Sequence, residues 1–117
     1  MPGPAAPSPL PTRQQLAELR NFVLERARTT AAIALQLNGE PPHPDPTALA
    51  DARHAGRALY MVVNMLSRRV LDAVHSGQPS EAARDAWGSL LVVADEWRDS
   101  PEMPEGLGAL VATCFGR

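Results

Sequence analysis

The sequence predicts an all-α protein, a small helical bundle of three long helices and a short C-terminal helix. Apolar residues recur at every third or fourth position through most of the chain, and no stretch alternates apolar and polar residues over the length of a strand. Prolines gather at the N-terminus and near the middle, where they separate the helical segments. The 117 residues are enough for one domain with its own core.

The first helix is expected over 12–38, after a proline-rich lead-in over 1–11 that we expect to be disordered. Thr12 and Gln15 have the spacing of a capping box, in which each side chain satisfies a free backbone amide of the other. A single apolar stripe follows, made of Leu16, Leu19, Val23, Ala27, Thr30, Ala34 and Leu37. Gly39 ends the helix, because glycine accepts the left-handed conformation of a C-terminal cap. The single helical domain then spans 12–117.

The second helix is expected over 46–76, beyond a stiff proline-rich connector. Asp45 can cap its start, and Gly77 closes it. One face has the alternating three- and four-residue spacing of a helix-packing seam and is expected to meet the first and third helices. The seam consists of Leu49, Ala52, Gly56, Leu59, Val63, Leu66, Val70 and Ala73.

The third helix is expected over 80–98, with Ser80 as its cap and with prolines after its end. Its apolar face consists of Ala83, Ala86, Leu90, Val93 and Trp97. A short fourth helix is expected over 105–115, weakened by the glycines near its start.

The second helix has an unusual outer face, opposite the seam, that is apolar in the middle and polar at both ends. We call this set of residues the outer face: Asp51, His54, Ala58, Met61, Met65, Arg68, Asp72 and His75. From Ala58 to Leu66 only Asn64 is polar, so this stretch needs cover on every side. Two alternatives could supply the cover: the fourth helix folding back with Leu107 and its neighbours, or a two-fold antiparallel homodimer.

The dimer has a definite register if its axis passes near Val63. Asp51 would then approach His75 of the partner subunit, and His54 would approach the partner's Asp72. The central methionines suit an adaptable interface, because the flexible thioether fills irregular gaps, although they would equally suit the core of a monomer.

Composition excludes several chemistries. All eleven basic residues are arginine, so no amine is available for a lysine-dependent phosphate loop, a Schiff base or a pyridoxal phosphate anchor. The net charge of −2 gives no general attraction to nucleic acid or anionic lipid. Arg53 and Arg57, with Arg68 and Arg69 further along, could form a narrow basic edge on the second helix, but acidic residues flank them. Nucleic acid is therefore a disfavoured partner.

Candidate catalytic and metal sites are few. Asp51 with His54, and Asp72 with His75, have a spacing that places carboxylate and imidazole side by side. The two pairs lie about 30 Å apart on one helix, so they cannot share a metal within a chain, and helix-dipole stabilisation is the simpler reason for Asp51 and His75 at its ends. Cys114 has no histidine near it in the sequence and is expected to be buried. We expect no catalytic residue, metal or cofactor.

The N-terminus has neither a basic start nor an apolar run, so it predicts no signal peptide and no membrane span. A single cysteine permits no intrachain disulfide, and the cytoplasm is the expected compartment. The alanine, arginine and proline bias is typical of GC-rich coding in an actinobacterial host.

The segment DEWRDSPEMP, residues 95–104, resembles a Trp-x-Asp-x-Pro helix ending in small uncharacterised all-helical actinobacterial proteins, with Ser100 where those proteins often have histidine. The resemblance implies no activity. Trp97 with Arg98 could anchor a partner protein, since these residue types are enriched at binding hot spots. The sequence thus favours a non-enzymatic helical adaptor or regulator that binds itself and another protein. The alternative is a small-molecule pocket lined by Met61, Met65 and the tryptophans.

Overall fold

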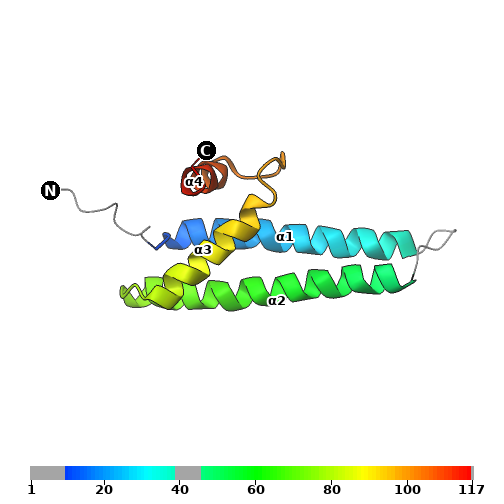
Figure 1. Ribbon diagram of the computed structural model, residues 1–117, viewed down its shortest axis with the longest axis horizontal. Coiled ribbons are helices and arrows are strands. Elements are labelled where there is room, and N and C mark those ends of the chain that lie inside the picture. Colours follow the sequence, from blue (N-terminus) through cyan, green and yellow to red (C-terminus); the bar gives the residue numbers. More distant parts are fainter. Residues whose placement is uncertain (1–9, 39–45, 117) are drawn as a thin grey trace.

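A computed structural model describes residues 10–38 and 46–116, with side chains described except at 30–38, 46, 48 and 49. It contains four helices: α1 (Arg13–Asn38), α2 (Pro46–Ser76), α3 (Glu81–Asp95) and α4 (Glu105–Cys114) (Figure 1). The described residues form no strand, and the expected all-α bundle is confirmed. Residues 1–9 of the proline-rich lead-in, the connector, the Gly39 stop and the Asp45 cap lie outside the described residues.

The expected caps form by the expected hydrogen bonds. The amide of Thr12 donates to Oε1 of Gln15 at 2.9 Å, and the amide of Gln15 donates to Oγ1 of Thr12 at 3.1 Å. Ser80 has an extended backbone, and its Oγ accepts from the amide of Ala83 at 3.0 Å. Gly77 follows α2 with φ of +71°, a left-handed conformation that favours glycine. Local sequence signals therefore fix these helix ends.

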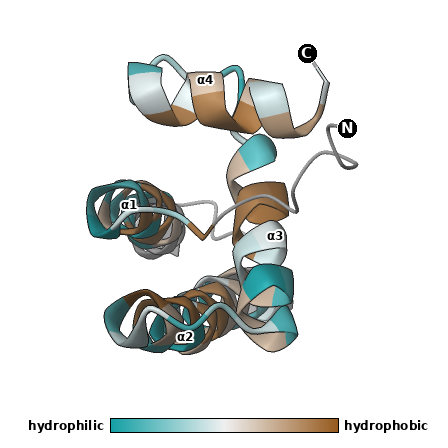
Figure 2. Cartoon of the chain, turned by 90° about the vertical axis from the view of Figure 1, so that its left-hand side faces the viewer, coloured by the Kyte–Doolittle hydropathy of each residue, from teal (hydrophilic) through white to brown (hydrophobic). Residues whose placement is uncertain are grey.

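The helices form an open arrangement rather than a closed four-helix bundle. α1 and α2 lie side by side as a long antiparallel hairpin, and α3 crosses one side of it, beginning at the C-terminal end of α2 (Figure 1). Figure 2 shows α3 on one side of the α1–α2 pair, with α4 beyond α1 and far from α2. The opposite side of the hairpin has no helix against it in the described part of the chain.

The core lies where the hairpin meets α3 and α4. Its fully buried side chains come from every helix, and the largest are Leu19, Val23, Val63, Val70, Leu90 and Val111. Earlier in α2, between Thr47 and Val62, the only described residue that is buried is Gly56. The N-terminal half of α2 therefore belongs to a two-helix arm that extends beyond the core.

The third helix is shorter than expected, because it ends at Asp95 rather than near residue 98. The chain continues in tight turns, with the amide of Trp97 bonded to the carbonyl of Ala94 at 3.0 Å and that of Arg98 to Asp95 at 3.1 Å. Such three-residue spacing commonly tightens the end of a helix. Pro101 then disfavours helical geometry in the residue before it.

α4 does not cover the outer face of α2. Its buried residues Leu107 and Val111 join the core beside α3 and α1, and among the described residues α4 makes no contact with α2. An ion pair of 3.6 Å between Arg26 of α1 and Glu102, just before α4, ties this end of the chain to α1. Of the two alternatives for the cover of the outer face, the one in which the fourth helix folds back over the second is therefore wrong.

Candidate functional site

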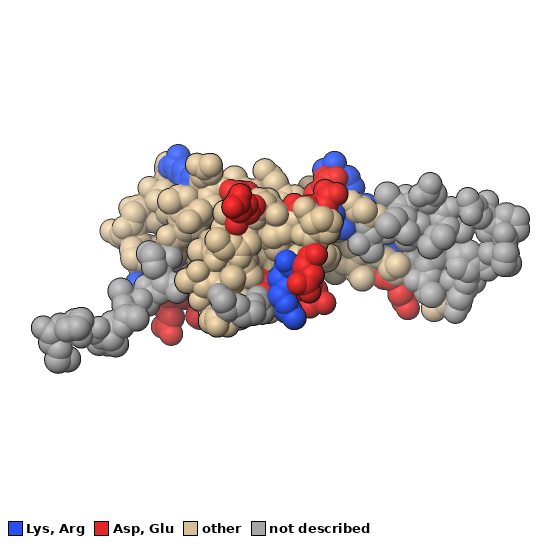
Figure 3. All heavy atoms as spheres, turned by 90° about the horizontal axis from the view of Figure 1, so that it is seen from above, with Lys and Arg blue, Asp and Glu red and all other residues tan. Residues whose placement is uncertain are grey.

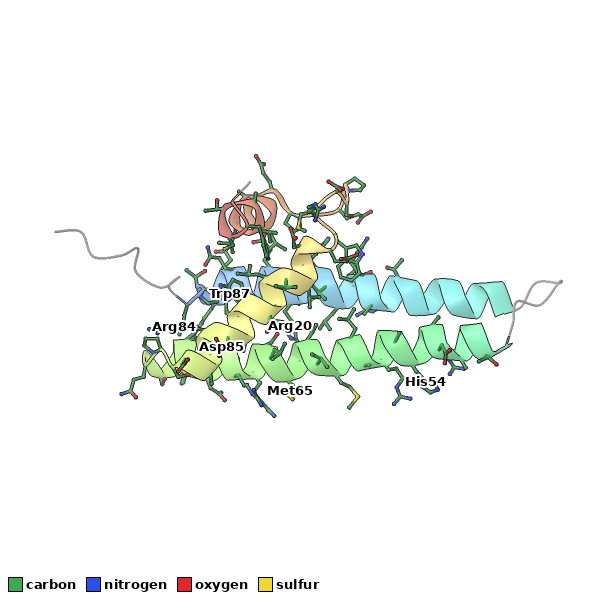
Figure 4. All side chains as sticks on the ribbon, in the orientation of Figure 1. Arg20, His54, Met65, Arg84, Asp85 and Trp87 are labelled. Carbon is green, nitrogen blue, oxygen red and sulfur yellow. The ribbon has the colours of Figure 1, made fainter. Side chains whose placement is uncertain are left out.

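The outer face of α2 is exposed along its whole length. Met61 exposes 66% of its surface and Met65 exposes 51%, although both are large and apolar. Ala58 is exposed between the methionines and the polar N-terminal part of the face. In Figure 4, Met65 and His54 point away from α1, on the free side of α2. Both methionines are thus surface residues, and the alternative that they fill the core of a monomer is wrong.

The exposed apolar surface is wider than the spacing analysis indicated. Tyr60 exposes 50% of its surface and Val62 exposes 43%, at positions beside the outer face. We call Tyr60, Met61, Val62 and Met65 the apolar band. Solvated Leu and Met side chains are ordinary when scattered, but a contiguous apolar patch usually marks an interaction site. The signal in the sequence was the nearly continuous run of apolar residues from Ala58 to Leu66.

The polar ends of the outer face are also exposed, and one of them is already hydrogen-bonded within the chain. Nη2 of Arg13, at the start of α1, donates to Nδ1 of His75 at 2.7 Å. Because guanidinium only donates, Nδ1 must be the acceptor, which leaves Nε2 of His75 to donate elsewhere. Asp51, His54 and Asp72 are exposed. Among the described residues of one chain, neither aspartate–histidine pair has further ligand residues beside it that could complete a metal site.

No group of three or more histidine, cysteine or carboxylate side chains that could hold a metal occurs among the described residues. Cys114 is exposed in the last turn of α4, so the expectation that it is buried is wrong. Cys114 lies seven residues after Leu107 on the same side of α4, but at the end of the helix, where it borders a hollow against α3.

The two residues of the possible partner anchor have different surroundings. Trp97 is half-buried and packs against the core, as expected for a side chain that presents one edge to solvent. Nη1 of Arg98 lies 3.5 Å from a carboxylate oxygen of Asp95 within the same turn. The anchor is therefore accessible only in part, and no contact places it next to the outer face.

The residues of the alternative small-molecule pocket are not brought together. Met65 lines a groove between α1 and α2, whereas Trp87 is buried in α3 and borders a separate hollow of about 440 Å³ with Cys114 and Phe115. Figure 4 places Met65 and Trp87 on different helices, with Trp87 above α2 and Met65 below it. A single pocket lined by both methionines and both tryptophans is not present.

The arginines of α2 do not form one continuous edge. Arg53 and Arg57 are exposed on the two-helix arm, whereas Arg68 and Arg69 line the α1–α2 groove with arginines of α1. On the face seen in Figure 3, acidic and basic side chains form small interleaved groups with uncharged surface between them. That pattern differs from the large cationic field typical of nucleic-acid interfaces.

No described helix combines the length and apolar character needed to cross a bilayer. Comparison with protein-family models, with curated proteins and with solved structures finds no match to the chain.

Proposed function

We propose that this protein is a non-enzymatic helical adaptor or regulator that acts by protein–protein interaction, and that it forms a two-fold homodimer through the outer face of α2. One observation carries the proposal: the exposed apolar band in the middle of α2, which α4 leaves uncovered. Leaving this much apolar surface in water is unfavourable, and an antiparallel helix of a second copy would bury it.

The spacing of residues about Val63 supports a symmetric contact. In an antiparallel pair of α2 helices, residues at equal distances before and after the axis meet. Met61 and Met65 lie two residues on either side of Val63, so each would pack on the other methionine of the partner subunit. Two such contacts flank the axis and form the apolar centre of the interface.

The charged ends have the same symmetry. His54 and Asp72 lie nine residues on either side of Val63, and Asp51 and His75 lie twelve residues on either side. Each aspartate would therefore meet a histidine of the partner subunit. Arg13 already occupies Nδ1 of His75, and this leaves the Nε2 hydrogen for the carboxylate of Asp51 of the partner subunit. Complementary polar partners of this kind fix the register more than they add affinity.

The two-helix arm gives a second reason for dimerisation. Two helices that pack only on each other leave much of their side-chain surface in water, and most described residues of α2 between Thr47 and Val62 are exposed. Two arms packed together would form a four-helix layer with a shared core, the usual solution for helical hairpins. We place the protein in the cytoplasm as part of this proposal, on the grounds that its single cysteine permits no intrachain disulfide.

The experiment that tests this proposal is sedimentation equilibrium of the full chain and of a Met61→Glu/Met65→Glu variant, with helicity measured by circular dichroism. The proposal requires a dimer for the parent chain and a monomer of unchanged helicity for the variant. A variant that keeps both its mass and its helicity would contradict the interface.

A further inference from the structure

The open side of the α1–α2 hairpin carries a groove of about 960 Å³, formed by side chains of these two helices and by no other described element. Four arginines line it: Arg13, Arg20, Arg68 and Arg69. We call it the arginine groove. The helix α3 lies on the other side of the hairpin, so it does not cover the groove (Figure 2).

The cations of the arginine groove are poorly balanced by acids. Nε and Nη2 of Arg20 donate to Oδ1 of Asn64 at 3.2 and 2.8 Å, and Arg13 donates to His75, so both guanidinium groups are held by neutral acceptors. The ion pairs among the described residues involve other arginines. Asp72 is the single carboxylate in the lining. The groove is therefore cationic in a chain whose net charge is −2.

The groove also has exposed apolar side chains. Met65 exposes 51% and Leu71 exposes 45% of its surface at the groove wall. Along α2 the lining runs from Asn64 to Asp72, which is about 12 Å or roughly two helical turns. A hollow of this length between two helices, lined by arginines and by exposed apolar side chains, has the form of a helix-binding groove.

We propose that the arginine groove binds an acidic amphipathic helix of a partner protein, with its carboxylates on the arginines and its apolar residues on Leu71, which lies outside the outer face. A guanidinium group pairs with a carboxylate through two parallel hydrogen bonds in a planar, bidentate geometry. Asn64 accepts from the Nε–Nη2 edge of Arg20 and so orients the guanidinium, while the Nη1–Nη2 end is the part that could meet a carboxylate. Preorganised donors reduce the entropic cost of association.

The described residues of the chain offer no suitable acidic helix as an occupant. Residues 1–9 contain no carboxylate. The segment that follows α1 leaves it at Asn38, 18 residues and about 27 Å along the helix from Arg20. The most acidic segment of a second copy, residues 95–105, runs through the turns between α3 and α4 rather than along one helix, and on α3 Arg84 lies between Glu81 and Asp85. A groove-to-α3 contact between copies would also be head-to-tail and would not close into a two-fold dimer. Nucleic-acid phosphates would leave the apolar wall without a partner.

This inference goes beyond the proposed dimer, since it assigns the second partner that an adaptor needs. The groove lies beside the outer face and shares Met65, Arg68 and Asp72 with it, whereas Met61 is outside the groove. A Met61→Glu variant therefore tests the dimer without altering the groove. Failure of one claim can thus be distinguished from failure of the other.

The test is a displayed library of amphipathic helical peptides of about 15 residues, whose polar positions vary among Glu, Gln and Lys, selected on the full-length protein. We expect Glu to be enriched at those positions. The Kd of the best peptide should rise about tenfold for Arg20→Gln/Arg69→Gln, two groove arginines outside the outer face, because each ion pair at the surface contributes roughly threefold. The matched control is Arg53→Gln/Arg57→Gln, which removes the same charge from exposed positions of α2 outside the groove and should leave Kd within about twofold.

Several results would overturn the proposal. One is a selection without Glu enrichment, and another is equal weakening by the two double variants, which would show an effect of net charge alone. A third is dissociation of the dimer by Arg20→Gln/Arg69→Gln, measured on the same samples, because the groove would then be a contact between copies. Peptide binding that survives Met61→Glu supports the groove whatever the oligomeric state.

Discussion

Replacing Met61 and Met65 by glutamate should separate the dimer without unfolding the monomer. Fully burying a methionine is worth about 1.5–3 kcal/mol. Met61 and Met65 expose 66% and 51% of their surfaces and so can still bury those fractions on association. The four methionines of a dimer would together contribute about 4–7 kcal/mol, and losing that contribution weakens association by at least about a hundredfold.

Sedimentation equilibrium over a range of concentrations measures this loss directly. The matched control is Val92→Glu, because Val92 of α3 is also apolar and exposes 59% of its surface, but it lies outside the outer face. Both changes are at exposed positions of the single chain, so each should alter the free energy of unfolding of the monomer by no more than about 0.5 kcal/mol. If the control dissociates the dimer as strongly as the methionine variant, or if neither does, the assignment of the interface to α2 is wrong.

Three further predictions test the register and the fold. Asp72→Arg should weaken the dimer, and adding His54→Glu should restore part of the affinity, because the new charges again match across the two-fold axis. Sedimentation equilibrium measures both dissociation constants. If the second change restores no affinity, the proposed register is wrong. Ser80→Ala should lower the free energy of unfolding by about 1 kcal/mol through loss of the cap, which urea denaturation measures, and an unchanged value would mean that the cap does not stabilise α3. Leu90→Ala, at a fully buried position, should lower the free energy of unfolding by about 2–5 kcal/mol, whereas Val92→Ala, at an exposed position, should lower it little. Similar losses for the two variants in urea denaturation would contradict the placement of α3.

Local signals predicted the helices well because each signal acts within one turn. The Thr12–Gln15 box, the Ser80 cap and Gly77 all occur where the sequence placed them. Periodicity also identified Leu19 and Val23 as core residues. It missed Phe22 and Leu24, because α1 contacts three other helices and therefore buries a wider arc than a single stripe. A stripe analysis assumes one buried side.

The tertiary features could not be read from spacing alone. The position of α4 depends on which helices Leu107 and Val111 pack against, and in the structure they join the core beside α1 and α3. From the sequence alone, the same short apolar face could equally have packed against α2. The arginine groove unites Arg20 with Arg69, which lie on different helices far apart in the chain. The sequence showed a surplus of apolar residues in the middle of α2, but it did not show which element, if any, packs against them.

Native mass spectrometry of the full-length protein tests the central claim most directly. The account predicts a principal species of twice the 12.5 kDa chain mass at micromolar concentration, shifted to the single-chain mass by Met61→Glu/Met65→Glu. A single-chain mass for the parent protein throughout the concentration range would contradict it.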